Sequence, residues 1–268
     1  MSEQFHIAIK THERAPTLAA KTLTLLQRHD ISTRQVTLFV ASDQQRQSYA
    51  DALPSFKGDI VVTGPGIKAA VSAIRRHWPG GNAVLHCDDD LMDLLVAGDD
   101  GKLHPIKDLG PYIETMFAMT RANRCALWSI YAVANAFFMQ NAVVAGLRFC
   151  SGCFHGFVSD AGADPWLLPT VNYKDDVEAS IRYFVKYGAV LRDERVAPKT
   201  QYFKTGGGGT AGTGHDDRTA LHIADAHALA AQWPGLCSVV TKKNFGGTDV
   251  RLNPRIKPTI VCPSPANH

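Results

Sequence analysis

The sequence lacks a strong charge of either sign. Its 268 residues carry 28 Lys and Arg against 25 Asp and Glu, which gives a formal net charge of +3. So small a net charge excludes nucleic-acid binding through an overall positive charge. Any such binding must come from local basic patches. The 45% hydrophobic content is enough to bury the core of one large domain or two small ones. We expect a single globular domain over residues 1–268.

Cysteine is sparse. Of the six cysteines, only Cys150 and Cys153 are close enough in sequence to suggest a motif. No second pair is present to complete a zinc site, and no helix start is evident there to activate a thiol. Scattered cysteines in a chain of this size favour reduced thiols. The first residues also lack the long apolar run of a secretory signal, so we expect a cytoplasmic protein.

A clear membrane span is missing as well. Residues 125–147 contain no charge and are long enough in principle to cross a bilayer. Ser129, Asn135, Gln140 and Asn141 interrupt this stretch, and its residues favour strands. We therefore expect strands or a hairpin here and no contact with a membrane.

The glycine-rich stretch TGGGGTAGTGHDDR, residues 205–218, is not a phosphate-binding P-loop. No Lys-Ser/Thr pair follows its glycines, and no strand leads through it into a helix. Two interpretations stay open: a lid that orders over a bound ligand, or a plain linker.

The first third of the chain alternates strand-like and helix-like segments. Strands are predicted at 5–10, 35–41, 58–64 and 82–87, and helices at 17–29, 43–53 and 67–78. Further helices are predicted at 108–123, 175–188 and 218–233. Such alternation indicates a parallel sheet covered by helices, and ligands collect at the carboxyl ends of its strands. Four stretches fall at such ends: 11–14, Ser42, 64–68 and 88–90.

Three adjacent carboxylates follow the last of these strands, in HCDDDL. Asp88, Asp89 and Asp90 repel one another unless a cation compensates them, and oxygen ligands favour Mg²⁺ or Mn²⁺. On an extended chain Asp88 and Asp90 point the same way and form the natural metal pair. A hard cation there suits a sugar-nucleotide diphosphate, which indicates glycosyl transfer. A solvated turn that caps a short helix is the alternative.

A second acidic group, in NYKDDVEAS, lies at a predicted helix start. Asp175, Asp176 and Glu178 are stabilised there by the helix dipole, and one of them can serve as general base towards an acceptor hydroxyl. An ordinary helix cap is the alternative. A base that acts on the acceptor implies a single displacement, and hence inversion at the anomeric carbon.

The segments IAIKTHERAPTL, VTLFVAS, GPGIK, AVLHCDDDL, KDDVEASIRYF and LRDERVAPKT together resemble the GT-A glycosyltransferases, specifically the TET/JBP-associated group of phages and kinetoplastids. The resemblance spans roughly residues 5–205. It implies an α/β, GT-A-like, mostly parallel sheet flanked by helices. It also implies transfer of a hexose, such as glucose from UDP-glucose, to 5-hydroxymethylcytosine or 5-hydroxymethyluracil in DNA, in the cytoplasm of a phage-infected bacterium.

The resemblance also divides the chain. Residues 1–92 would form the nucleotide-sugar half, 93–205 the acceptor half with the catalytic helix, and 206–268 the glycine-rich stretch, a helix and a basic tail. It assigns the metal and the donor diphosphate to Asp88 and Asp90, with Asp89 beside them. It makes Asp176 the base, and Asp175 stands where glutamate is common, so either neighbour could take that role.

Further donor contacts are carried over in the same way. KTHER implicates Thr11 and Arg14 at the nucleotide, and GPGIK implicates Lys68 near the diphosphate. Gly152, in SGCFHGF, suits a close backbone approach beside the sugar pocket. His215 is the expected further metal ligand, with a solvated loop histidine as the alternative.

DNA as the acceptor rests mainly on the resemblance. Two basic groups could bind phosphates: Arg121, Arg124 and Arg148, and Lys242, Lys243, Arg251, Arg255 and Lys257 in the tail. Ordinary solvated surface explains these groups equally well. If DNA binds, the modified base has to leave the stack, because a duplex hides its hydroxymethyl group. Two rival functions stay open: a nucleotidyltransferase of related fold, and a non-catalytic GT-A-like binding domain.

Overall fold

The computed structural model describes residues 4–160, 164–200, 215–242, 247–253 and 255–257. For residues 215–218 and 242 it describes only the backbone.

The first part of the chain forms four parallel strands in the order β3-β2-β1-β4. These are β1 (Phe5–Lys10), β2 (Val36–Val40), β3 (Asp59–Val62) and β4 (Ala83–Asp88). They are joined by α1 (Ala15–Leu18), the π-helical η1 (Ala19–Leu23), α2 (Thr24–Arg28), the short 3-10 helix η2 (Thr33–Gln35), α3 (Asp43–Ala52) and α4 (Ile67–His77). The helix predicted at 17–29 is therefore real, but a π-helical segment interrupts it.

The rest of the chain extends this sheet to eight strands, in the order β3-β2-β1-β4-β9-β7-β10-β8. The added strands are β7 (Leu127–Ile130), β8 (Val143–Gly146), β9 (Phe154–Val158) and β10 (Val190–Asp193). β7 and β10 pair in parallel, whereas β9 is antiparallel to β4 and β7, and β8 to β10. Six strands thus end at the same edge of the sheet.

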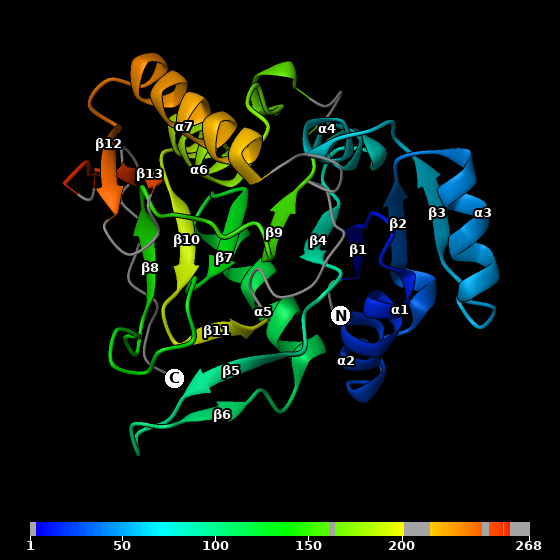
Figure 1. Cartoon of the computed structure of the whole chain (residues 1–268). Helices are drawn as coiled ribbons and strands as arrows, with labels where there is room; N and C mark the ends of the chain where they lie inside the picture. The colour runs from blue at the N-terminus through cyan, green and yellow to red at the C-terminus, as the bar shows by residue number, and fades with distance from the viewer. Residues whose placement is uncertain (1–3, 161–163, 201–214, 243–246, 254, 258–268) are drawn as a thin grey trace.

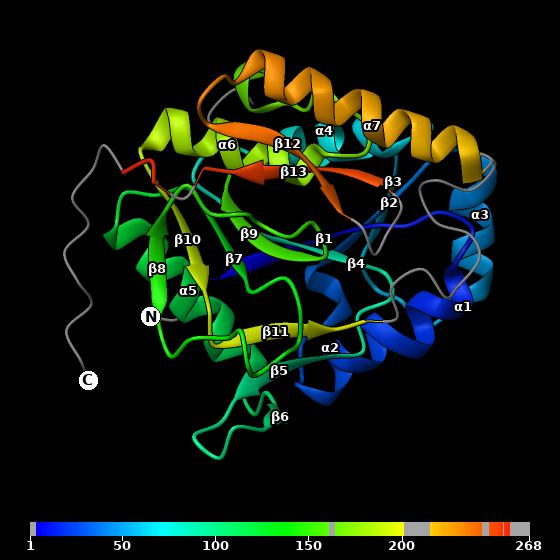
Figure 2. The ribbon, with the colours of Figure 1, turned by 60° about the vertical axis from the view of Figure 1, so that its left-hand side comes forward.

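Helices cover both faces of this sheet (Figures 1 and 2). The core of one face joins the sheet to α1, α2, α3 and α5 (Leu109–Ala122). The core of the other face joins it to α4, α6 (Asp175–Tyr187) and α7 (His215–Gln232). Smaller elements complete the fold: the sheet of β11 (Val196–Lys199), β5 (Asp93–Ala97) and β6 (Leu103–Pro105), the 3-10 helix η3 (Pro165–Leu167), and the hairpin of β12 (Cys237–Lys242) and β13 (Gly247–Leu252). Two apolar faces therefore need two helical layers.

The uncharged stretch at 125–147 forms β7, a connection and β8, as its strand-favouring residues predict. Among the described residues, no helix is both long and apolar enough to cross a membrane. Cys150 and Cys153 are buried and are not joined in a disulfide, and burial raises the pKa of Cys150. A raised pKa makes a thiol unreactive, so the structure gives no support to a redox role for Cys150.

Gly156 is the glycine of SGCFHGF that a close approach requires. It lies on β9 against the indole of Trp128, and a Cβ placed there would be 2.1 Å from Trp128 Nε1. At Gly156 the close approach is therefore a packing contact within the sheet. Gly152 differs, because its Cβ would meet Asp176 Cβ at 3.5 Å, an ordinary contact distance.

Gly156→Ala is expected to destabilise the protein by about 2–3 kcal/mol, because the added methyl group would displace a fully buried tryptophan. Urea unfolding followed by tryptophan fluorescence measures this loss. Gly110→Ala is the matched control, since a Cβ at this α5 position meets nothing within 4 Å. Equal midpoints for the two variants would contradict the prediction.

Candidate active site

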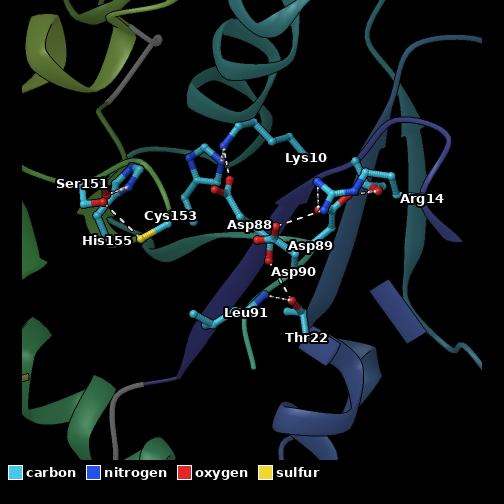
Figure 3. Close-up of polar contacts among 12 residues, drawn as sticks. Lys10, Arg14, Thr22, Asp88, Asp89, Asp90, Leu91, Ser151, Cys153 and His155 are labelled. Atoms are coloured by element: carbon cyan, nitrogen blue, oxygen red, sulfur yellow. Dashed lines mark hydrogen bonds and ion pairs between the residues drawn. The ribbon is translucent and has the colours of Figure 1, made fainter. Parts of the chain in front are cut away.

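The candidate site lies where β1 and β4 end side by side. The two strands are parallel neighbours, and their register places Lys10 opposite Asp88. The Lys10 ammonium donates to Asp88 Oδ1 at 2.5 Å, as Figure 3 shows. Lys10 was not among the residues expected at the site. Its place as the last residue of a predicted strand, directly before Thr11, was the signal that could have identified it.

The acidic triplet is compensated by cations of the protein itself. Arg14 contacts Asp89 at 2.9 Å and Asp90 at 3.0 Å (Figure 3). Thr11 also donates to Asp89, at 2.7 Å. Lys10 and Arg14 together therefore neutralise much of the charge of Asp88, Asp89 and Asp90. Each cation comes from β1 or from the residues that directly follow it.

The expectation that Asp88 and Asp90 lie on one side of an extended chain is wrong. β4 ends at Asp88, and the chain turns at Asp89 and Asp90. Thr22 stabilises this turn, because its hydroxyl donates to the Asp88 carbonyl at 2.8 Å and accepts the Leu91 amide at 3.0 Å (Figure 3). The turn is not a solvated one, since Asp89 is 3% exposed. Burial raises the pKa of Asp89 to about 6, although Thr11 and Arg14 oppose this shift.

The second acidic group begins α6, as predicted. Asp176 Oδ1 accepts the amide of Val177 at 2.8 Å, and the backbone of Gly152 hydrogen-bonds the same carboxylate. Burial raises the pKa of Asp175 to about 7, with Asp176 adding to the shift and Lys10 opposing it. Burial also raises the pKa of Asp176, against its backbone hydrogen bonds. The two carboxyl groups interact and titrate as a pair.

Lys10 links the two acidic groups. Burial alone would lower the pKa of Lys10, but Asp88 and then Asp175 outweigh that effect and raise it. Asp88 in turn raises the pKa of Asp175. Two carboxylate clusters about 87 positions apart in the sequence therefore influence the same lysine.

Glu178, the third acid of this helix start, belongs to the fold. It is fully buried, accepts the amides of Thr170 at 2.7 Å and Val171 at 3.2 Å, and pairs with Arg182 at 2.6 Å. All of these contacts are internal. Glu178 is thus an unsuitable proton acceptor for a bound substrate.

A cleft of about 500 Å³ opens beside the triplet. Its walls come from the ends of β1 to β4, the start of α4, the residues before α6, and α7. Lys10, Thr11, Arg14, Asp88 and Asp89 line it. This volume is typical of a small-molecule site, and both cationic and acidic side chains line it.

Asp175 and Asp176 line a different, much smaller cavity of about 10 Å³. Arg75, His86 and His155 line it together with the two carboxylates. Burial lowers the pKa of both histidines well below the usual value, so both are neutral at pH 7. Arg75 is 5% exposed, donates to the Tyr183 hydroxyl at 3.0 Å and lies 4.0 Å over the Phe157 ring. The sequence alone did not indicate that Arg75, His86 and His155 lie beside the two carboxylates.

The residues present are compatible with a divalent metal at Asp88. Its side chain is 34% exposed, against 17% for Asp90, whose carboxylate binds Arg14. Within the described part of the chain, no three His, Cys, Asp or Glu side chains converge as a complete metal site. Mg²⁺ and Mn²⁺ need no such set, because one or two carboxylates can hold them together with water and substrate phosphates. The side chain of His215 lies outside the described residues.

Lys68 does not line the cleft. It lies in the first turn of α4, exposed, and donates to the Thr170 carbonyl at 3.3 Å. This contact ties α4 to the residues before α6. A contact between Lys68 and a diphosphate stays a prediction, as does a place for Gly152 beside a sugar.

The basic groups proposed for DNA are only partly described. Arg251, Arg255 and Lys257 are exposed, on and after β13. Arg121 donates to the Gly81 carbonyl at 2.7 Å, so it also has a structural role. Lys243 and the side chain of Lys242 lie outside the described residues.

Comparison with known proteins adds evidence on the fold. No protein-family model and no curated protein matches the sequence. Solved structures do match. The structure of residues 1–349 of S. aureus TarS is similar to this one with a TM-score of 0.51 and 12% sequence identity, and the match covers 85% of this chain and 65% of that one. A mycobacterial protein matches with a TM-score of 0.51 and 10% sequence identity, and this match covers 94% of this chain and 84% of that one. The fold is GT-A-like.

This result confirms the α/β class expected from the sequence, a mostly parallel sheet flanked by helices.

A third match is the mannosyltransferase PcManGT from Pyrobaculum calidifontis, solved with GDP-Man and Mn²⁺. It is 14% identical with a TM-score of 0.48, over 86% of this chain. The chain spans only 63% of PcManGT and 65% of the TarS fragment, slightly less than two thirds of each.

Proposed function

We propose that this protein is a metal-dependent, inverting glycosyltransferase that uses a nucleotide sugar. One observation carries the proposal: Lys10 pairs with Asp88 at the wall of the 500 Å³ cleft, and its charge also acts on Asp175, which lines a smaller cavity together with Asp176. A transferase of this kind needs a cationic end for the departing diphosphate and a carboxylate beside it to accept a proton. We assign the cationic end to Lys10 and Arg14, which line the cleft, and the carboxylate to the Asp175–Asp176 pair.

The chain's residues divide these tasks. The nucleotide would occupy the cleft, with its diphosphate towards Lys10, Arg14 and Asp88. A Mn²⁺ or Mg²⁺ ion held by Asp88 would neutralise the charge that develops on the departing diphosphate. Asp176 is the proposed base, because the amides of Val177 and Gly152 fix its carboxylate. It would accept the acceptor's hydroxyl proton as the new glycosidic bond forms, which inverts the anomeric carbon.

The identities of the donor and the acceptor are proposed from the resemblance to the TET/JBP-associated glycosyltransferases. We propose UDP-glucose as the donor and a 5-hydroxymethylpyrimidine in DNA as the acceptor. The exposed Arg251, Arg255 and Lys257 support contact with a polyanion. We also propose that the protein acts in the cytoplasm of a phage-infected bacterium, where such DNA would be found.

The test uses DNA that contains 5-hydroxymethylcytosine or 5-hydroxymethyluracil. The protein is incubated with it, Mn²⁺ and a panel of nucleotide sugars, and the nucleosides are analysed by mass spectrometry. A mass gain of one hexose, with equimolar UDP release, supports the proposal. Pyrophosphate release from a nucleoside triphosphate would instead show a nucleotidyltransferase. Binding without any turnover would show a non-catalytic domain.

The pH dependence of transfer follows from the raised pKa values of the carboxylate pair. A base must be ionised to accept a proton, so kcat/KM should rise with pH and level off above about 7, the value to which burial raises the pKa of Asp175. An ordinary aspartate would already be ionised at pH 5. Initial rates between pH 5 and pH 9 at constant ionic strength measure this profile. A rate that is independent of pH from 5 to 9 would contradict a base in this pair.

A further inference from the structure

The segment that leads into α6, residues 170–174, is held at every position by an acidic side chain. Glu178 accepts the amides of Thr170 and Val171, as described above. Asp225 Oδ2 accepts the amides of Asn172 at 3.0 Å and Tyr173 at 2.8 Å. Lys174 Nζ pairs with Asp249 Oδ1 at 2.8 Å. Five consecutive residues are thus fixed immediately before Asp175.

Two of these three acids come from distant parts of the chain. Asp225 lies on α7 and Asp249 on β13, whereas Glu178 lies on α6 itself. In Figures 1 and 2, α7 and the β12–β13 hairpin lie over the same face of the sheet as α6. The C-terminal elements therefore determine where the 170–174 segment lies.

The 170–174 segment has two connections to the proposed site. Asn172 and Tyr173 line the cleft together with Leu221 of α7, and the Tyr173 and His222 rings lie 4.7 Å apart. Lys174 directly precedes the carboxylate pair, and its charge lowers the pKa of Asp176 against the larger opposite effect of burial. Moving this segment would change both the cleft wall and the surroundings of Asp176.

We propose that Asp225 and Asp249 are positioning residues of the active site. Asp225 fixes the Asn172–Tyr173 wall of the cleft against a bound nucleotide sugar. Asp249 holds Lys174 in place beside Asp176. The proposal rests on the proposed function, since it assigns these residues to donor binding and to proton transfer in that same reaction.

The two residues are expected to affect different steps. Without Asp225, two backbone amides lose their acceptor and the cleft wall loosens, so the donor should bind more weakly. Without the charge of Asp249, Lys174 is no longer held towards β13, so the step that needs Asp176 should slow while the cleft wall stays intact. One structural role for the whole segment would affect both steps together.

The experiment on Asp225 measures donor binding. Asp225→Ala should weaken the affinity for UDP-glucose with Mn²⁺, measured by titration calorimetry, by roughly 10- to 100-fold, the range for hydrogen bonds to a charged group. Asp225→Asn keeps an oxygen acceptor and should restore affinity to within about threefold of wild type. Asp43→Asn, an exposed carboxylate at the start of α3, is the control and should change nothing.

The experiment on Asp249 measures turnover. Asp249→Asn and Lys174→Met should each lower kcat about tenfold with the donor KM unchanged. Because both variants remove the same ion pair, the double variant should be no slower than either single one. Additive losses, or a change in KM alone, would contradict the proposed role of Asp249.

Hydrogen exchange provides a test that needs no variant. The amides of Asn172 and Tyr173 should be protected in the wild-type protein, and unprotected amides would overturn the role of Asp225 even if Asp225→Ala fails to fold. The two proposals can be separated. Wild-type protein that neither binds nor uses any nucleotide sugar overturns the proposed function, and with it this inference. Normal donor binding by Asp225→Ala overturns the Asp225 assignment alone.

Discussion

Asp176→Asn is expected to lower kcat by about a thousandfold, with donor affinity within a few-fold of wild type. A general base contributes about 10²–10⁴ in rate. Asparagine has nearly the same shape and can still accept the Val177 amide, so the start of α6 should keep its structure. Only the ability to accept a proton is lost. Initial rates of UDP release together with titration calorimetry measure the two quantities.

Asp175→Asn is the matched variant, one residue away on the same helix. It removes the carboxyl group whose pKa burial raises to about 7, so the two groups no longer titrate as a pair and the acid limb of the pH profile should move to lower pH. We expect it to keep activity to within about tenfold at pH 8. If Asp175→Asn abolishes transfer and Asp176→Asn does not, Asp175 is the base. If neither variant loses activity, the pair has no catalytic role.

Asp88→Asn is expected to weaken Mn²⁺-dependent binding of the nucleotide sugar by about 100-fold. Asp88 is the most exposed carboxylate of the triplet and lines the cleft, so it is the natural metal ligand. Asparagine keeps the shape but removes the charge that a hard cation requires. Some binding should remain, because Lys10 and Arg14 can still attract a diphosphate. Calorimetric titrations with and without Mn²⁺ separate the two contributions.

Asp90→Asn distinguishes a metal ligand from a partner of Arg14. Its carboxylate binds Arg14 and is less exposed than that of Asp88, so we expect less than a tenfold effect on Mn²⁺ dependence. Asp100→Asn, on the exposed turn between β5 and β6, is the control and should have no effect. Equal losses for Asp88→Asn and Asp90→Asn would show that both carboxylates bind the metal. An unchanged Mn²⁺ dependence in Asp88→Asn would contradict the metal site.

Local patterns in the sequence were sufficient to predict the fold of the first third of the chain. Apolar runs identified β1 to β4, and the helices between them followed from periodicity, because the 2-residue and 3.6-residue repeats are properties of short segments. The same reasoning identified both acidic groups, since charge at a strand end or at a helix start is a local signal. It also predicted that the acidic triplet lies at a ligand site, because parallel strands end at one edge of a sheet. A place for the second acidic group at the same site was implied only by the resemblance to the GT-A glycosyltransferases.

Contacts between distant residues could not be predicted in this way. The sequence does not show that Lys10 and Arg14 neutralise the triplet, because those pairs form only once β1 and β4 lie side by side. Nor does it show that Thr22 turns the chain at Asp89, which is why the expected alternation of Asp88 and Asp90 was wrong.

The sequence by itself determined the first four strands and the main helices, and which carboxylates are available for chemistry. The tertiary structure alone decided which of those carboxylates remain accessible. Asp88, Asp175 and Asp176 line cavities, whereas the buried Glu178 carboxylate accepts hydrogen bonds from within the fold. The physical reason is that the accessibility and pKa of a carboxylate depend on burial and on neighbouring charges, and both are set by residues far away in the chain.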